Sequence, residues 1–257
     1  MSFLAAIGRA AIEGLAEVGR ISRFLALALR HAVTPPFYFK LLYREMLRIG
    51  YFSLPVIGLT AIFTGAALAQ QIYLGTIRFN AENTVAGVTV IAIVRELGPV
   101  LAGLMVAGRV ASAMAAEIGT MRVSEQIDAL VTLSTNPVKY LVVPRLYASV
   151  LTLPLLVVVA NIIGIFGGFL IGTQKLGFNE ASYLQVTVDY LEASDIESSL
   201  VKAAVFGFIL ALMGCYQGFH SKGGAAGVGE ATTDAVVSSF ILILLANLII
   251  TVNVFGS

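Results

Sequence analysis

Two adjacent ionisable residues, Arg95 and Glu96, lie inside an apolar stretch that covers residues 85–116. At about 1.5 Å per helical residue, Arg95 lies roughly 15 Å from the start of this stretch, near the middle of a ~30 Å hydrocarbon core. A charged side chain at that depth costs at least ~2.5–3.5 kcal/mol, so it normally faces a cavity or a partner. Neighbouring helical positions point about 100° apart, so the two residues do not pair along the helix. The pattern favours a polar site on a substrate path; an ion pair between helices is the alternative.

The helix is weakened just beyond this pair. Pro99 has no N–H to donate to the carbonyl of Arg95, four residues earlier. A kink at Pro99 would give the side chains of Arg95 and Glu96 room to face a cavity.

The composition is that of a membrane protein. Hydrophobic residues make up 58% of the 257 positions and charged residues only 12%, unlike an ordinary soluble domain. Five apolar stretches are long enough to span a bilayer: about 51–74, 85–116, 146–173, 200–219 and 235–255. The sequence therefore predicts an all-α membrane protein with a five-span domain over residues 51–257.

Lysine and arginine residues are segregated along the chain. Seven lie in residues 1–50, and three more (Arg122, Lys139 and Arg145) lie in the loop 117–145. The loop 174–199 and the other segments on the opposite side hold few basic residues and six acids. The positive-inside rule then predicts that the N-terminus is cytoplasmic and that the C-terminus lies on the opposite side.

Residues 1–50 form the first of two predicted domains and read as helices that lie on the membrane. Pro35-Pro36 divides this segment, and Lys40, Arg44 and Arg48 then recur every four residues among apolar positions. Such basic amphipathic helices suit an anionic cytoplasmic leaflet. The alternative is a solvated helix packed on a partner protein.

The loop between spans two and three carries a second signal. Ser124 could cap a short helix, with Glu125 and Asp128 in its first turn and Asn136-Pro137 at its end. A short cytoplasmic helix between two spans is typical of a permease that contacts a soluble ATPase. We predict that the coupling residues are Glu117, Ile118, Gly119, Thr120, Met121, Glu125, Gln126 and Asp128.

The sequence gives no sign of catalytic machinery of its own. The glycine-rich stretch 223–230 is followed by Ala231 instead of the Lys-Ser/Thr of a phosphate loop, so we read it as a flexible cytoplasmic turn. No His, Cys and Asp residues have metal-binding spacing, and no serine has a plausible His/Asp pairing. We therefore expect no metal, no cofactor, no nucleic-acid partner and no enzymatic activity in this chain.

Small and amide side chains predict a tightly packed bundle. Gly164, Gly168 and Gly172 recur at four-residue spacing in the third span, a pattern that lets helices approach closely. Three asparagines in or near the spans are expected to form interhelical hydrogen bonds: Asn161, Asn247 and Asn253.

Three motifs resemble the MlaE family of permeases: residues 94–101 (VRELGPVL), 108–110 (GRV) and 117–130 (EIGTMRVSEQIDAL). Asn136-Pro137 and Pro144-Arg145 fit as well, and the similarity extends over essentially the whole chain. The resemblance implies a membrane subunit of an ATP-binding-cassette transporter that moves phospholipid between the inner and outer membranes and preserves outer-membrane lipid asymmetry. It also implies an inner-membrane location, a homodimer, a cytoplasmic ATPase and a periplasmic lipid-binding hexamer.

Under that interpretation, Arg95 could bind a lipid phosphate, with Glu96 as its orienting partner or as a repulsive group that helps release the anion. Arg109 lies about 21 Å further along the helix, near the cytoplasmic boundary. The apolar wall of the lipid site is assigned to residues from spans one and two: Leu97, Val100, Leu68, Gln71 and Leu74.

Two other classes of protein remain open. An ion- or proton-coupled carrier would also place ionisable residues at the midplane, but we find no internal repeat of the kind many carriers show. An intramembrane lipid-modifying enzyme would need a nucleophile or metal set, and none is evident.

Overall fold

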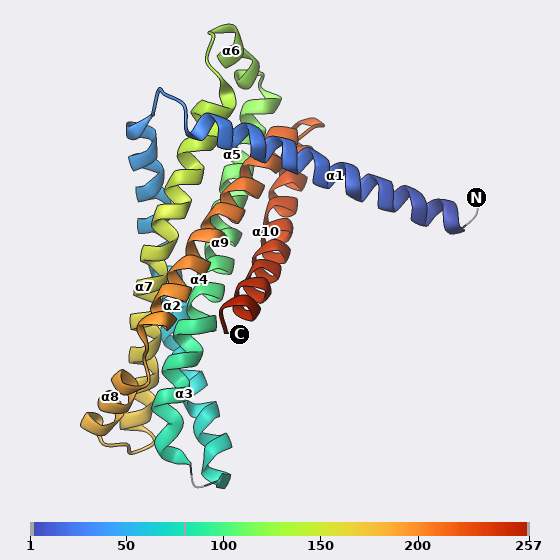
Figure 1. Cartoon of the computed structure of the whole chain (residues 1–257). Coiled ribbons are helices and arrows are strands. Elements are labelled where there is room, and N and C mark those ends of the chain that lie inside the picture. The colour runs from blue at the N-terminus through green and yellow to red at the C-terminus, as the bar shows by residue number, and fades with distance from the viewer. Residues whose placement is uncertain (1–2, 80, 256–257) are drawn as a thin grey trace.

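The computed structural model describes residues 3–79 and 81–255, and all regular structure in these residues is helical (Figure 1). The chain has five long helical segments, and Figure 1 shows the long helices side by side as an upright bundle. Each is long and apolar enough to cross a membrane: Phe39–Phe79, Val85–Val123, Val138–Gln174, Ala193–His220 and Gly224–Asn253. The predicted all-α class and the five predicted spans are therefore confirmed.

The second span is not a regular α-helix. It consists of α3 (Val85–Ala92), α4 (Gly98–Val106) and α5 (Ser112–Val123), joined by two π-helical turns, Ile93–Leu97 and Ala107–Ala111. Such turns widen a helix locally and are frequent at functional sites. The first of them carries Arg95 and Glu96, just before Pro99.

Glycine residues let the spans approach closely, as predicted. In the contact between α2 (Phe39–Thr76) and α7 (Val143–Gln174), a Cβ atom on Gly65 would lie only 1.9 Å from the carbonyl oxygen of Gly164. Between α7 and α9 (Ala193–His220), a Cβ atom on Gly207 would lie 2.5 Å from the carbonyl oxygen of Ser149. Backbone contact of this kind fits only glycine.

The predicted asparagine contacts are confirmed at two of three positions. Asn161 Nδ2 donates to Ser199 Oγ at 3.2 Å, and Asn247 Nδ2 donates to Glu96 Oε2 at 2.8 Å. The prediction for Asn253 is wrong, because its amide donates to the carbonyl of Ile249 in its own helix.

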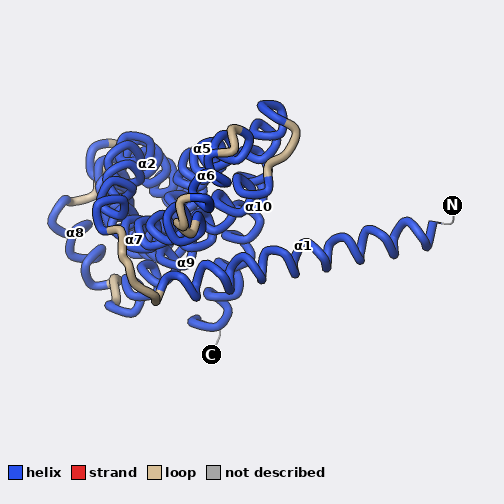
Figure 2. Tube along the Cα trace, turned by 90° about the horizontal axis from the view of Figure 1, so that it is seen from above, coloured by secondary structure: helices blue, strands red, loops and turns tan. Residues whose placement is uncertain are grey.

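The N-terminal helix α1 (Phe3–Ala32) runs away from the bundle, as Figure 2 shows from above. From Glu17 onward α1 contacts the other helices: Tyr216 of α9 donates to Glu17, and Phe24 and Ala28 are buried, whereas Ile12 and Leu15 are exposed. The predicted break at Pro35-Pro36 separates α1 from α2. Residues 39–50 are continuous with the first span, however, because no helix breaker follows Phe39 until that span is under way.

Two predicted helix boundaries in the loop 117–145 are wrong. Ser124 does not cap the short helix α6 (Gln126–Thr132), because α5 extends to Val123 and the Ser124 hydroxyl donates to the carbonyl of Thr120. Glu125, with φ of 58°, makes the turn instead. The helix ends at Thr132, and Asn136 caps the start of the next helix, where its Oδ1 accepts from the Lys139 N–H at 3.2 Å.

Two further boundaries differ at the start of spans four and five. Helix α9 begins at Ala193 instead of residue 200, because Glu192 and Asp195 form a capping box there. The glycine-rich stretch 223–230 is not a flexible turn. Helix α10 (Gly224–Phe255) begins inside it, and the reversal of the chain is confined to residues 221–223, where Gly223 has φ of +85°.

Helix α8 (Glu180–Asp189) lies in the loop 174–199, at the end of the bundle opposite α6 (Figure 1). The side chain of Asn179 caps it by accepting from the Ser182 N–H at 3.1 Å.

Candidate functional site

Glu96 lies at the centre of a polar cluster between the second span, α9 and α10. Its carboxylate accepts from Lys202 Nζ at 2.7 Å, from Thr251 Oγ1 at 2.8 Å and from Asn247 Nδ2 at 2.8 Å. The Lys202 side chain is fully buried, whereas that of Glu96 is 38% exposed. A buried ammonium needs both a counter-charge and hydrogen-bond acceptors. This cluster supplies them from three helices.

Lys202 also supplies a hydrogen bond that Pro99 cannot make. Its Nζ donates to the carbonyl of Arg95 at 2.7 Å. That carbonyl is the group from which Pro99 withholds a helical N–H. One lysine therefore neutralises Glu96 and satisfies the backbone oxygen beside it.

Arg95 forms a second ion pair on the same turn. Its Nε lies 2.5 Å from Oδ1 of Asp195, whose side chain is fully buried. The other carboxylate oxygen of Asp195 accepts from the Glu192 N–H at 3.3 Å and so caps α9. Since Arg95 and Glu96 contact different residues of α9, the π-helical turn is fixed to that helix at two points.

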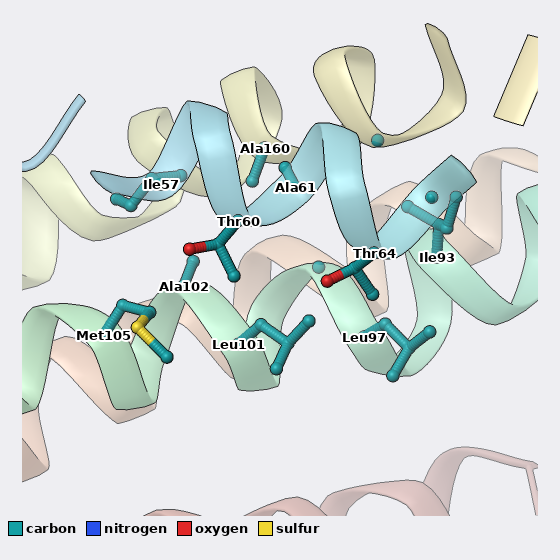
Figure 3. Close-up of a pocket in the computed structure, with 13 residues that line it drawn as sticks. Ile57, Thr60, Ala61, Thr64, Ile93, Leu97, Leu101, Ala102, Met105 and Ala160 are labelled. Carbon is teal, nitrogen blue, oxygen red and sulfur yellow. The ribbon is translucent and has the colours of Figure 1, made fainter. Parts of the chain in front are cut away.

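A narrow cleft opens beside this turn, between α2, the second span and α7 (Figure 3). Thr60 and Thr64 of α2 lie across it from Leu97, Leu101 and Met105 of the second span. The cleft encloses about 20 Å³, room for about one water molecule. Within the described residues, the cleft of a single chain is thus too small for a phospholipid.

The five residues predicted to form the apolar wall of the lipid site differ in burial and in position. Leu97 lines the cleft. Val100 is half-buried and packs against the core, and Leu68 is half-buried on α2. Gln71 and Leu74 are exposed nearer the end of α2 that faces α8. One chain therefore does not bring these five residues together around one cavity.

Arg109, on the second π-helical turn, connects the second span to α2. Its guanidinium donates to Ser53 Oγ at 2.8 Å, to the carbonyl of Arg48 at 2.9 Å and to the carbonyl of Ile49 at 3.2 Å. These contacts give Arg109 a role in holding two helices together.

The predicted coupling residues divide into two groups. Glu117 forms ion pairs with Arg48 at 2.6 Å and with the buried Arg145 at 3.1 Å, which connects α5 to α2 and α7. Ile118 and Gly119 are buried in the bundle. The remaining five lie nearer the tip of the loop: Met121 is half-buried, and Thr120, Glu125, Gln126 and Asp128 are exposed.

Sequence reasoning missed the partners of the central pair: Asp195, Lys202 and Thr251. The sequence predicts that the fourth span begins at residue 200, which leaves Asp195 in the loop 174–199 and Lys202 at the very start of the span. Their spacing of seven residues was a usable signal, because positions i and i+7 share one helical face. Thr251 carries no such signal in the sequence.

The fold and the site together define a multi-pass membrane protein. One of its spans is interrupted by a π-helical turn, and the ionisable residues of that turn belong to a buried polar cluster. No group of three or more His, Cys, Asp and Glu residues in the described part of the chain could hold a metal ion.

Comparisons with known proteins agree with this class. The model of the family "Permease MlaE" matches residues 42–253. The chain is 53% identical over 245 residues to a probable ABC transporter permease protein of Rickettsia bellii, covering 95% of each chain. It is 32% identical over 258 residues to the intermembrane phospholipid transport system permease protein MlaE of Haemophilus influenzae, covering 100% of this chain and 99% of that one. The chain belongs to the MlaE permease family.

A plant relative extends the comparison. The chloroplastic protein TRIGALACTOSYLDIACYLGLYCEROL 1 of Arabidopsis thaliana is 38% identical over 207 residues, which cover 80% of this chain and 59% of that protein.

Proposed function

We propose that this chain is the permease subunit of an ATP-driven transporter that moves phospholipids between the inner and outer membranes and maintains outer-membrane lipid asymmetry. Family membership and the name of the Haemophilus relative support the substrate class. The observation that carries the proposal is the position of the Glu96–Lys202 cluster, on an interrupted helix directly beside the cleft lined by Leu97. The cluster offers charged groups for a headgroup next to apolar walls for acyl chains.

The size of the cleft supports a transporter built from two copies of this chain. Symmetric pairs are the commonest oligomers, and two copies could enclose a lipid-sized cavity that the cleft of about 20 Å³ in one copy does not provide. In this proposal Arg95, Glu96, Leu97 and Val100 face the shared pathway, with Leu68, Gln71 and Leu74 of α2 along its wall.

The ATPase would bind the end of the bundle that carries α6. Glu125, Gln126 and Asp128 are exposed there, and Asp128 forms only an exposed ion pair with Arg122, at 2.8 Å. The distribution of Lys and Arg supports a cytoplasmic location for this end and a periplasmic location for the α8 end, where a lipid-binding hexamer would dock. Labelling of tags at Met1 and Ser257 in intact cells tests the orientation: only the Ser257 tag should be reachable from the periplasm.

Co-purification tests the assignment of the ATPase surface. Glu125→Lys/Asp128→Lys should abolish recovery of the ATPase with this chain, because an exposed acidic pair would then oppose a basic groove. Glu180→Lys/Asp189→Lys, which reverses two exposed acids at the opposite end, is the matched control and should leave recovery unchanged. Unchanged recovery with both double variants would place the contact elsewhere, and an active chain that never binds an ATPase would favour an ion- or proton-coupled carrier.

A further inference from the structure

A cavity of about 260 Å³ lies at the junction of α1 and α2, far from the central cluster. Its walls come from the connecting segment, the first turns of α2 and the start of the third span. They are almost wholly apolar and rich in aromatic rings, including Phe37, Tyr38 and Tyr147. The cavity approaches the size of a small-molecule pocket, about 300 Å³ at the lower limit.

The rim of this cavity carries a cation that has no acidic partner among the residues the structure describes. Lys139 Nζ donates to Thr34 Oγ1 at 3.3 Å and to the carbonyl of Pro35. Both acceptors are uncharged, and in the described part of the chain Lys139 forms no ion pair with a carboxylate. His31, also at the rim, contacts the Asn136 amide at 3.1 Å. The positive charge of the ammonium is therefore held in place but not neutralised.

The position of the cavity matches the boundary of a membrane. It lies where the chain turns from α1 into the first span, at the end of the bundle that carries α6 (Figure 1). Phe37 and Phe39 are 48% and 72% exposed there, as expected for aromatic residues at the level of lipid headgroups. An occupant would therefore meet hydrocarbon on one side and headgroups on the other.

We propose that this cavity binds an anionic phospholipid of the surrounding leaflet, with part of one acyl chain between Phe37, Tyr38 and Tyr147 and the phosphate on Lys139. A net negative headgroup matches the single uncompensated charge, whereas the cationic end of a zwitterionic headgroup would oppose it. The site is separate from the proposed transport pathway and does not depend on transport.

The absence of tryptophan from the chain allows a direct test. Phe37→Trp introduces a single tryptophan at the cavity, and the full-length variant is reconstituted in vesicles that contain a brominated phospholipid as quencher of tryptophan fluorescence. Brominated phosphatidylglycerol should quench with about fivefold higher relative affinity than brominated phosphatidylcholine, the preference expected of one ammonium near an anionic headgroup. Leu155→Trp, at a 62% exposed position within α7 that is ten residues from the nearest Lys or Arg in the sequence, should show no preference.

Two variants then assign the preference to Lys139. In the Phe37→Trp background, Lys139→Gln should reduce the preference to about onefold, and Lys139→Arg should retain it. Equal quenching by the two lipids in Phe37→Trp itself would overturn the proposal, whether or not Lys139→Gln folds. A preference that survives Lys139→Gln would also overturn it, because the fluorophore would then report ordinary lipid around the protein.

Discussion

At the scale of single residues, the buried charged side chains in the middle of this protein are each paired with an opposite charge. Lys202 and Asp195 are fully buried, and each forms an ion pair with one member of the adjacent pair, Lys202 with Glu96 and Asp195 with Arg95. Removing one partner of such a pair leaves an uncompensated charge at low dielectric, which costs far more than removing both. Each buried member of a pair is therefore expected to need its partner for stability.

A double-mutant cycle on Glu96 and Lys202 tests this interpretation. Lys202→Met and Glu96→Gln should each lower stability by about 3–5 kcal/mol, and the double variant should cost clearly less than their sum. Thermal unfolding of the purified chain in detergent is the measurement. Lys175→Met, which removes an exposed lysine, should change little. Additive losses would show that the two side chains act independently.

From the sequence we could identify Arg95 and Glu96 as candidate site residues, but not their partners Asp195 and Lys202. Arg95 and Glu96 stand out because they interrupt a long apolar stretch. The acidic and polar residues around 189–197 read as a loop, so Asp195 gave no sign of a place within the bundle. The sequence left both a substrate site and an interhelical ion pair open, and the short Arg95–Asp195 and Lys202–Glu96 distances establish the ion pairs.

At the scale of elements, the contact between α2 and α7 depends on glycine. A Cβ atom on Gly65 would lie 1.9 Å from the carbonyl oxygen of Gly164, and that oxygen belongs to rigid backbone. Gly65→Ala should therefore cost about 1–3 kcal/mol or more, because the two helices must separate. Gly75→Ala, in the same helix with no atom within 4 Å of the new Cβ, should be close to neutral. Equal unfolding temperatures for the two variants would contradict the packing described here.

The docking of α1 has a charged component that responds to pH. Tyr216 Oη donates to Glu17 Oε1 at 2.6 Å, and Arg20 Nε donates to Glu17 Oε2 at 2.9 Å. The hydrogen bond from Tyr216 and, next, that from Arg20 hold the pKa of Glu17 below its ordinary value of 4.5. Because the pKa is lowered in the folded state, this contribution is present above pH 4.5 and is lost as the pH falls through the lowered value.

A nitroxide at Val18→Cys measures this contact, since Val18 is exposed and the native Cys215 is buried. The label should become more mobile as the pH falls below about 4.5. In the Tyr216→Phe background it should already be more mobile at pH 7. A spectrum that is the same at both pH values and in both backgrounds would show that the apolar contacts of Phe24 and Ala28 alone hold α1.

The sequence predicts which segments form the long helices, but it does not predict the residues at which those helices begin and end. Apolar stretches longer than 18 residues identify spans by length alone. Their limits depend on tertiary contacts, as at Ser124, whose hydroxyl donates to a carbonyl in α5 instead of capping α6. Glycines at 224, 227 and 229 suggested a turn, yet they lie in α10, where the intervening alanines favour a helix.

At the scale of the whole molecule, one chain provides some of the features that the proposed function needs, but its described residues form no lipid-sized cavity along Leu97. It supplies five spans, the short helix α6 at one end of the bundle and a polar cluster beside a cleft. The cleft itself holds about 20 Å³. In the proposed function, a phospholipid pathway along Leu97 would need a second copy, so the proposal connects the oligomeric state to the substrate.

Photocrosslinking at Leu97 tests the central claim most directly. A benzophenone side chain at Leu97 of the purified complex should give a covalent phospholipid adduct on illumination. This adduct should decrease when Arg95→Gln/Asp195→Asn removes both charges of the neighbouring pair. The same probe at Leu155, a 62% exposed position on α7, should give an adduct that this double variant does not change. No phospholipid on Leu97, or the same response at both positions, would contradict a lipid pathway beside the Arg95–Glu96 turn.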